Sequence, residues 1–456
     1  SFPQYIDALA AVPRSIDVFA QVPHDALRVY AMGDRAVAGE IATDDEIAAM
    51  RALVRESLKA GAAGFSTGRT DNHRAATGAP TPSSEVDARE LRGLAEAFDG
   101  AGHGVLQAVS DFDMHLGPDR FDAEFDLLEG MAVAAGGHAL SISLMQRDTE
   151  PGQWRRVLAR VEAARAKGLD VRVQVAPRAI GVMLGLQATF HPFVGFPSYK
   201  AVAHLPLDER VRAMHDPAFK ARLLTERSEP LAGDGSSVPP LVDVLLARLD
   251  MVALRLFHMG ERFDYEPAIE RSLYAEAMST GKPLLEVLYD ALLRDDGREL
   301  LYFPLHNYTE MTLDNVRAMM AHPASLLGLS DGGAHVGTVC DASHATFALC
   351  HWTRDRATGR LPLEALVKKL SFDNASYLGL TDRGAVSVGA RADLNVIDHA
   401  RLALHRPYVA NDLPAGGRRL VQKATGYRAT IVKGELTVVD DRLTDARPGR
   451  LVRAGR

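Results

Sequence analysis

A repeated alternation of amphipathic helix and short apolar strand constrains the fold of this chain more than any other feature. One clear unit has capping-box spacing between Thr43 and Glu46, and its helix ends at Gly61. An apolar segment, residues 62–68, follows at once and ends in hydroxyl groups and a glycine. The pattern gives six candidate strands, at residues 15–22, 62–68, 104–109, 139–144, 171–175 and 326–329. It predicts a parallel α/β fold of the (β/α)8 TIM-like barrel type, in which eight strands would close the barrel.

The alternation is interrupted between residues 176 and 310, and it ends near residue 381. The interruption contains a Pro- and Gly-rich stretch, residues 228–240, and one further short strand, residues 300–303. After residue 381 the chain consists of short alternating strands joined by Gly and Asp turns. The sequence therefore predicts a partial barrel over residues 1–380 with an insertion at about 176–310, and a small C-terminal β-sandwich part over residues 381–456.

Composition excludes several classes of function. Of the 456 residues, 47% are hydrophobic, and the net charge of −7 gives no basic surface for a nucleic acid. No apolar window reaches the length of about 18 residues that a membrane span requires. Only two cysteines are present, Cys340 and Cys350, so no disulfide framework is expected. We expect a cytoplasmic protein without nucleic-acid or membrane partners.

Asp331 stands at the end of the last candidate strand. The apolar run of residues 326–329 stops at Ser330 and Asp331, and two glycines follow, with His335 four residues after the aspartate. In a (β/α) barrel the catalytic groups lie at the C-terminal ends of the strands, which makes Asp331 a candidate base or metal ligand. An aspartate before two glycines is also typical of an ordinary turn, which this stretch by itself favours. Both interpretations stay open on these residues alone.

Further polar residues follow two other strands. Ser66 lies at the end of the strand at 62–68, and Arg69, His73 and Arg74 come after it, all within nine residues. Guanidinium groups favour bidentate contact with a carboxylate. Alternatively, these residues form a solvent-exposed loop whose polar groups hydrogen-bond to one another and not to a substrate. After the strand at 300–303 comes His306-Asn307-Tyr308, of which Asn307 is taken as a candidate substrate contact. The remaining pattern contains no HExxH, no phosphate loop and no GxSxG elbow.

Four segments of the chain resemble the amidohydrolase superfamily, in particular its N-acyl-D-amino-acid deacylase (D-aminoacylase) branch. They are GAAGFSTG at 61–68, LLGLSDGGAHVG at 326–337, ASYLGLTDRGAVSVGARADLNVID at 375–398 and DLPAGGRRL at 412–420. The resemblance implies a barrel with a β-sandwich and one or two divalent metals, usually zinc. It also implies that Asp331 is a metal ligand and shuttles a proton between a metal-activated water and the leaving amine.

The chain departs from the family pattern in two ways. The His-x-His of the family's first strand and the cysteine of its second are not found, so we expect the first barrel strands to be absent from this chain. Where the family has two histidine ligands, Val109 and Leu144 stand here, and neither can bind zinc. Gln146 stands where a substrate-binding lysine is common. A single zinc ion, or none, is expected, and it would need either the upstream His-x-His pair or a substitute ligand such as Asp111, His115 or His73.

The resulting hypothesis is a hydrolase of the amide C–N bond in an N-acyl amino acid or a related small amide. Asp331 would be catalytic, and Ser66, Arg69, His73, Arg74, Asn307 and His335 would contact the substrate. One alternative is a metal-free or divergent relative acting on another substrate. Another is a non-catalytic subunit that completes a barrel with a second chain. We expect a homo-oligomer or an association with the missing N-terminal portion.

Overall fold

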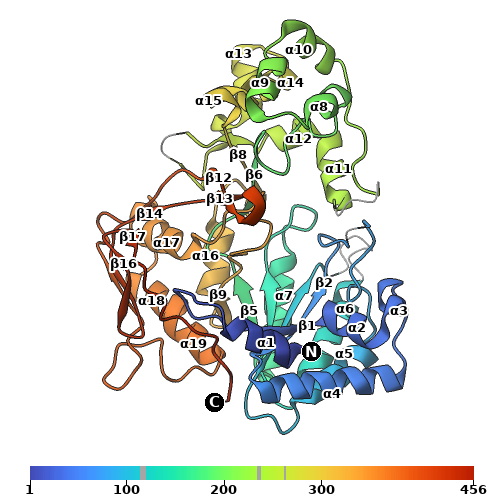
Figure 1. The fold of residues 1–456 in the computed structure, drawn as a ribbon, viewed down its shortest axis with the longest axis vertical. Helices are drawn as coiled ribbons and strands as arrows, with labels where there is room; N and C mark the ends of the chain where they lie inside the picture. Colours follow the sequence, from blue (N-terminus) through green and yellow to red (C-terminus); the bar gives the residue numbers. More distant parts are fainter. Residues whose placement is uncertain (76, 113–119, 234–237, 261–262, 456) are drawn as a thin grey trace.

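The computed structural model describes residues 1–75, 77–112, 120–233, 238–260 and 263–455. Within these ranges, six parallel strands form the central sheet in the order β1-β2-β3-β4-β5-β9 (Figure 1). The strands are β1 (Gln21–Pro23), β2 (Gly64–Arg69), β3 (Val105–Ser110), β4 (Leu140–Leu144), β5 (Val171–Val175) and β9 (Ser325–Leu327). The six predicted strands are confirmed, although β1 covers only the end of the predicted segment.

The unit α4–β2 illustrates how the sequence builds this sheet. Helix α4 (Asp44–Ala60) begins with a capping box, because the Glu46 N–H donates to the Thr43 hydroxyl and the Thr43 N–H donates to the Glu46 carboxylate. Gly61 ends the helix with a φ of 107°. At the start of β2, a Cβ on Gly64 would overlap the carbonyl oxygen of Val105 on β3, so only glycine allows this strand spacing.

Helices before and after these strands cover the sheet. They are α2 (His24–Met32), α4, α5 (Ala88–Ala95), α6 (Arg120–Ala134), α7 (Gln153–Ala166) and α16 (Asp314–Ala321). Their apolar faces join the strand side chains in one large hydrophobic core. Parallel strands covered by helices place their carboxyl ends at a common edge, which is where the polar side chains of the candidate site gather.

Between β5 and α16 the chain forms a separate layer, which we call the excursion (residues 176–313). It contains helices α8 (Pro197–Val202) to α15 (Arg294–Gly297) and a three-stranded sheet, β6 (Ile180–Leu184), β8 (Leu301–His306) and β7 (Phe257–His258), in that order. The predicted strand at 300–303 is therefore present, but it pairs antiparallel inside the excursion and not in the barrel sheet. A second hydrophobic core fills this layer (top of Figure 1).

The C-terminal part is rich in short antiparallel strands. A four-stranded sheet has the order β10 (Leu394–Ile397), β15 (Tyr427–Val432), β16 (Glu435–Val439) and β17 (Arg442–Leu443). The hairpin β12 (Tyr408–Leu413)–β13 (Gly417–Val421) lies beneath the excursion (Figure 1). Its Leu420 N–H donates to the Val336 carbonyl at 2.7 Å, which ties the hairpin to the loop that carries Asp331.

Across the described ranges, the helices are too short or too polar to cross a membrane.

Candidate active site

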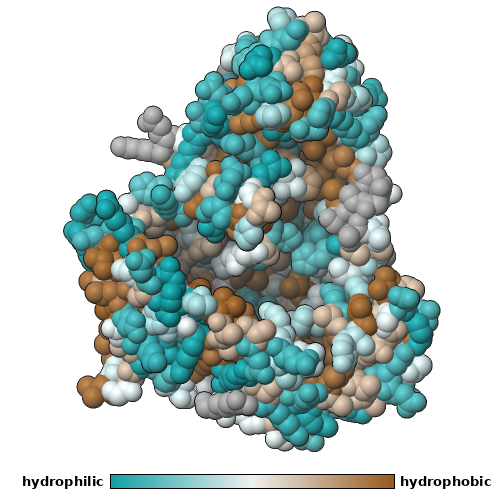
Figure 2. Space-filling view, in the orientation of Figure 1, coloured by the Kyte–Doolittle hydropathy of each residue, from teal (hydrophilic) through white to brown (hydrophobic). Residues whose placement is uncertain are grey.

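A cavity of about 850 Å³ lies between the carboxyl ends of the barrel strands and the excursion. Figure 2 shows this hollow at the centre of the molecule, below the excursion. Asp331, His73, Arg74 and His335 line its barrel side. A concave site at the strand ends is the usual position of an active site in a barrel fold.

The loop after β9 presents Asp331 to this cavity. Asp331 has a φ of 44° and His335 a φ of 50°, and the Ala334 N–H donates to the Asp331 carbonyl at 3.0 Å. The excursion holds the same loop, because the Met183 N–H donates to the Thr338 carbonyl at 2.8 Å. The backbone of Asp331 thus makes a turn, and its side chain is exposed and lines the cavity; its role as a base or metal ligand stays a prediction.

The charge of Asp331 is influenced by three nearby histidines, His73, His335 and His344. The rings of His73 and His335 stack with their centroids 5.6 Å apart. Partial desolvation in the cavity, with the negative charge of Asp341 nearby, raises the pKa of Asp331 above its ordinary value. Desolvation, with the charge of His335 nearby, lowers the pKa of His73. A carboxyl with a raised pKa beside an imidazole with a lowered pKa can exchange protons with a bound substrate.

Arg74 supplies a positive charge on the same side of the cavity. Its guanidinium donates to the Asp71 carboxylate at 2.9 Å and is mostly buried. No other Arg or Lys lines the cavity in the part of the chain that the structure describes. Arg74 is therefore the best-placed group to attract a substrate carboxylate.

Three of the predicted site residues are placed elsewhere. Arg69 is buried, and its guanidinium binds both oxygens of Glu124 on α6, at 2.6 and 2.9 Å. Asn307 is also buried, and its side-chain oxygen accepts from the Gln146 N–H at 2.7 Å. Ser66 lies within β2 and does not line the cavity. These positions make Arg69 and Asn307 part of the framework that holds the strand ends, and we do not carry the three forward as substrate contacts.

The cavity contains other polar residues that are not among the predicted site residues. Ser143 on β4, His191 in the excursion and His306 at the end of β8 line it. Each has a buried polar atom, Oγ, Nε2 and Nδ1 respectively, for which no hydrogen-bond partner is found among the described residues. Burial, with the charge of Arg147 nearby, lowers the pKa of His306 to about 4. The segment His306-Asn307 lies beside the cavity as predicted, but the histidine lines the cavity and the asparagine does not.

Comparison with known proteins decides the family. A model described as the amidohydrolase family matches residues 1–438. The chain belongs to the amidohydrolase family. The resemblance inferred from the sequence segments is thereby confirmed.

Similar relatives of this amidohydrolase include three deacylases of Alcaligenes xylosoxydans xylosoxydans. An N-acyl-D-aspartate deacylase is 26% identical over 463 residues, covering 100% of this chain and 72% of the relative. A D-aminoacylase is 24% identical and covers 99% of this chain and 73% of the relative. An N-acyl-D-glutamate deacylase is 25% identical over 399 residues, covering 86% of this chain and 63% of the relative. These relatives are hydrolases of amide C–N bonds.

Solved structures agree on the fold. A D-aminoacylase structure concerned with a binuclear metal centre matches 99% of this amidohydrolase and 75% of its own chain, with a TM-score of 0.56 and 22% identity. An N-acyl-D-glutamate deacylase from Bordetella bronchiseptica, in complex with zinc and a phosphonate inhibitor, matches 100% of this chain and 75% of its own, with a TM-score of 0.55 and 20% identity. The predicted amidohydrolase-type barrel fold is confirmed.

The described side chains of this amidohydrolase do not fit a zinc site. Protein zinc sites use three or four His, Cys, Asp or Glu ligands, and no group of three or more such residues converges among the residues described here. Val109 lines the cavity, whereas Leu144 is buried. The carboxylate of Asp111, a predicted substitute ligand, accepts a hydrogen bond from the Asp71 N–H at 2.7 Å. His115 lies outside the described residues.

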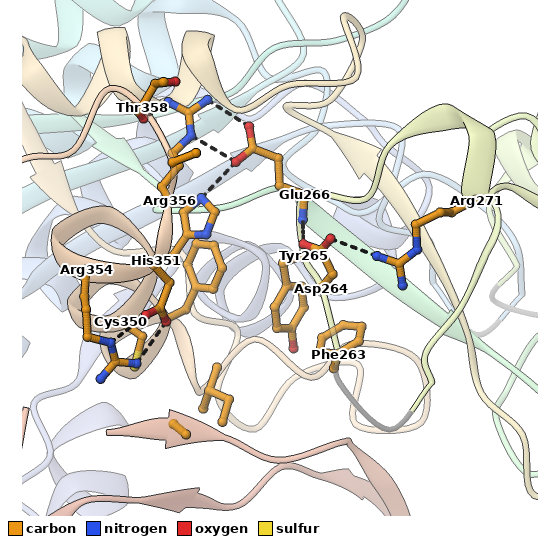
Figure 3. A pocket seen from close by; sticks show the side chains of 15 residues that line it. Phe263, Asp264, Tyr265, Glu266, Arg271, Cys350, His351, Arg354, Arg356 and Thr358 are labelled. Atoms are coloured by element: carbon orange, nitrogen blue, oxygen red, sulfur yellow. Dashed lines mark hydrogen bonds and ion pairs between the residues drawn. The ribbon is translucent and has the colours of Figure 1, made fainter. Parts of the chain in front are cut away.

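A second, smaller cavity of about 640 Å³ has a different character (Figure 3). It lies between the excursion and the π-helix Ala348–Asp355. Arg356 binds both oxygens of Glu266, at 2.8 and 3.0 Å, and His351 lies 2.9 Å from the same carboxylate. Burial alone would raise the pKa of Glu266, but His351 and Arg356 hold it well below the ordinary value. These paired charges connect the excursion to the barrel, so we assign this cavity a structural role.

Proposed function

We propose that this amidohydrolase cleaves the amide C–N bond of an N-acyl amino acid in the cavity beside Asp331. The observation that carries the proposal is the grouping of Asp331, His73, His335 and Arg74 at the carboxyl ends of strands in an amidohydrolase fold. The deacylase relatives act on N-acyl-D-amino acids, which supports this class of substrate and the D configuration.

Asp331 moves the proton in the proposed reaction. Its carboxylate takes a proton from water as the water oxygen attacks the amide carbonyl carbon. The same carboxyl then gives the proton to the amide nitrogen as the C–N bond breaks, releasing a carboxylic acid and an amine. The raised pKa of Asp331 suits this second step, because it favours the protonated form. No step is assigned to a metal ion, because the described side chains do not form a site for one.

The neighbouring side chains hold the substrate. Neutral His73 and the adjacent His335 donate hydrogen bonds to the carbonyl oxygen, on which negative charge develops. Arg74 binds the carboxylate of the amino-acid half. The guanidinium thus orients the amide so that its carbonyl carbon lies toward Asp331.

The test is an assay of the purified full chain with matched N-acyl-D- and N-acyl-L-amino acids, following the free amine by chromatography. Release of amine from at least one N-acyl amino acid is expected, with loss of release in Asp331→Asn. Absence of amine release across both series would contradict the proposal. The apolar Val109 and Leu144 favour one alternative, a divergent amidohydrolase for another amide, and a panel of cyclic and simple amides run beside the amino-acid series would reveal it.

A further inference from the structure

The two sides of the main cavity differ in chemistry. The barrel side carries the charged groups Arg74 and Asp331 and the stacked histidines. The excursion side is mainly aliphatic and aromatic, with Val182, Leu184 and Phe303 from its sheet and further leucines from its helices. No charged residue lines the cavity on the excursion side within the described residues. A ligand that fits this cavity is therefore polar at one end and apolar over the rest of its length.

Helix α11 (Pro240–Ala247) forms much of the apolar side. Leu241, Val242, Leu245 and Leu246 line the cavity, at the i, i+1, i+4 and i+5 spacing of one helix face. None of the helix residues is fully buried, so this face is only partly used to fill the excursion core. Brown side chains on the excursion next to the hollow are visible in Figure 2. A contiguous apolar surface that stays accessible inside a cavity indicates a binding surface.

The position of Arg74 determines which half of an N-acyl amino acid meets this apolar surface. If the proposed function holds, the carboxylate lies at Arg74, and the amino-acid side chain, attached to the same α-carbon, stays near the polar end. The acyl chain leaves the carbonyl carbon on the opposite side, toward the excursion. A cavity of about 850 Å³ is far larger than an acetyl group requires, since cavities of about 300–1,000 Å³ hold drug-sized ligands.

We propose that the acyl group is a medium-chain aliphatic group of about eight carbons or more, held against α11 and the β6–β8 sheet. This inference rests on the proposed function and narrows its substrate class. Each methylene that moves from water onto an apolar surface contributes about 0.8 kcal/mol, which corresponds to about a fourfold increase in kcat/KM.

The first experiment compares acetyl, butanoyl, hexanoyl, octanoyl and decanoyl derivatives of one D-amino acid. We expect kcat/KM to rise about two- to fourfold per methylene until the chain fills the cavity. If the acetyl derivative is hydrolysed as well as or better than the octanoyl one, the inference is overturned while the proposed function stands. If no derivative is hydrolysed, the proposed function fails, and a binding measurement then decides the acyl preference.

That measurement is calorimetric titration of the wild-type chain and Asp331→Asn with the N-octanoyl and N-acetyl amino acids. Tighter binding of the octanoyl compound by about a hundredfold or more supports the apolar site, and equal affinities overturn it.

A matched pair of valines on α11 tests the location. Val242 lines the cavity, whereas Val244 on the same helix is 61% exposed and does not line it. Val242→Asp is expected to lower the octanoyl-to-acetyl preference at least about tenfold, because the acyl chain would meet a charge. Val244→Asp is expected to keep the wild-type preference. An equal effect of the two substitutions, or none from Val242→Asp, would place the acyl chain elsewhere and refute the inference.

Discussion

The imidazole rings of His73 and His335 stack at 24° with their centroids 5.6 Å apart. His73 follows β2 and His335 follows β9, and the sheet order places β3, β4 and β5 between these strands. In a flat sheet, four spacings of about 4.8 Å would separate β2 from β9 by about 19 Å. In a sheet curved as in a barrel these two strand ends lie closer together, and the loops that carry the two histidines meet at the cavity that Asp331 also lines.

Asp331→Asn is expected to reduce kcat by about a hundredfold or more, because the amide cannot take or give a proton. Stability should change little, since Asn accepts the left-handed backbone of this position, with a φ of 44°, as well as Asp does. Asp440→Asn is a matched control, because Asp440 also has a φ of 44° but lies in the C-terminal β part. Steady-state kinetics and thermal unfolding of both variants test this. Activity of Asp331→Asn equal to that of Asp440→Asn would rule out the proton role.

Arg74→Ala is expected to raise KM by about ten- to hundredfold for substrates with a free carboxylate, since a charge-assisted contact contributes about 1.5–3 kcal/mol. For an amidated substrate, which lacks that charge, the KM should change little in Arg74→Ala. The measurement is KM for each substrate in wild type and variant. A similar rise in KM for both substrates would show that Arg74 acts through loop structure and not through the carboxylate.

The buried pair Arg69–Glu124 gives a prediction about stability. Glu124→Ala leaves the mostly buried guanidinium of Arg69 without its carboxylate, so the free energy of unfolding should fall by about 3 kcal/mol. The control is Asp126→Ala on the same helix. The Asp126 side chain is 69% exposed and pairs with Arg160, so the free energy of unfolding should fall by less than about 1 kcal/mol. Urea unfolding measures both. Equal decreases in the free energy of unfolding would show that the buried pair stabilises the fold no more than the exposed one.

The strands and the position of Asp331 can be predicted from sequence because local patterns determine them. Apolar runs bounded by helix ends identify each strand, and the residue that follows a parallel strand must lie at the common edge of the sheet. The excursion is also recognisable as a break in the alternation. The strand at 300–303 is expected inside the break, but a short apolar run does not reveal which strands it pairs with.

The substrate side of the cavity is harder to predict because partners far apart in sequence decide it. Arg69 stands at a strand end as a substrate-binding arginine would, but Glu124 on α6 binds its guanidinium and also accepts from the Ser110 hydroxyl of β3. Ser143 and His191 carry no motif, and only the folded excursion brings them to one cavity. Sequence patterns therefore indicate at which strand end a residue lies. Tertiary packing determines whether its side chain is paired within the protein or is free to bind a substrate.

His191 gives a prediction about pH. Burial lowers its pKa from 6.5 to about 3, so the folded chain keeps this ring neutral while the unfolded chain binds a proton below pH 6.5. Its contribution to the free energy of unfolding should therefore fall by up to about 1.4 kcal/mol per pH unit as the pH drops from 6.5 toward 3. His191→Asn can still accept the Phe193 N–H and should reduce this slope, whereas the same change at exposed His204 should not. Denaturant unfolding at several pH values tests this, and identical slopes for wild type and His191→Asn would contradict it.

Metal content provides the last prediction. A structural or catalytic zinc site needs at least three protein ligands, and the described residues bring no such group together. Protein purified without chelator and then desalted is therefore expected to contain well below one zinc per chain, and EDTA should leave amine release unchanged. Atomic-emission analysis and the amide assay measure the two. One tightly bound zinc per chain would contradict the prediction. If Asp331→Asn also lowered that zinc content, Asp331 would be one of the ligands.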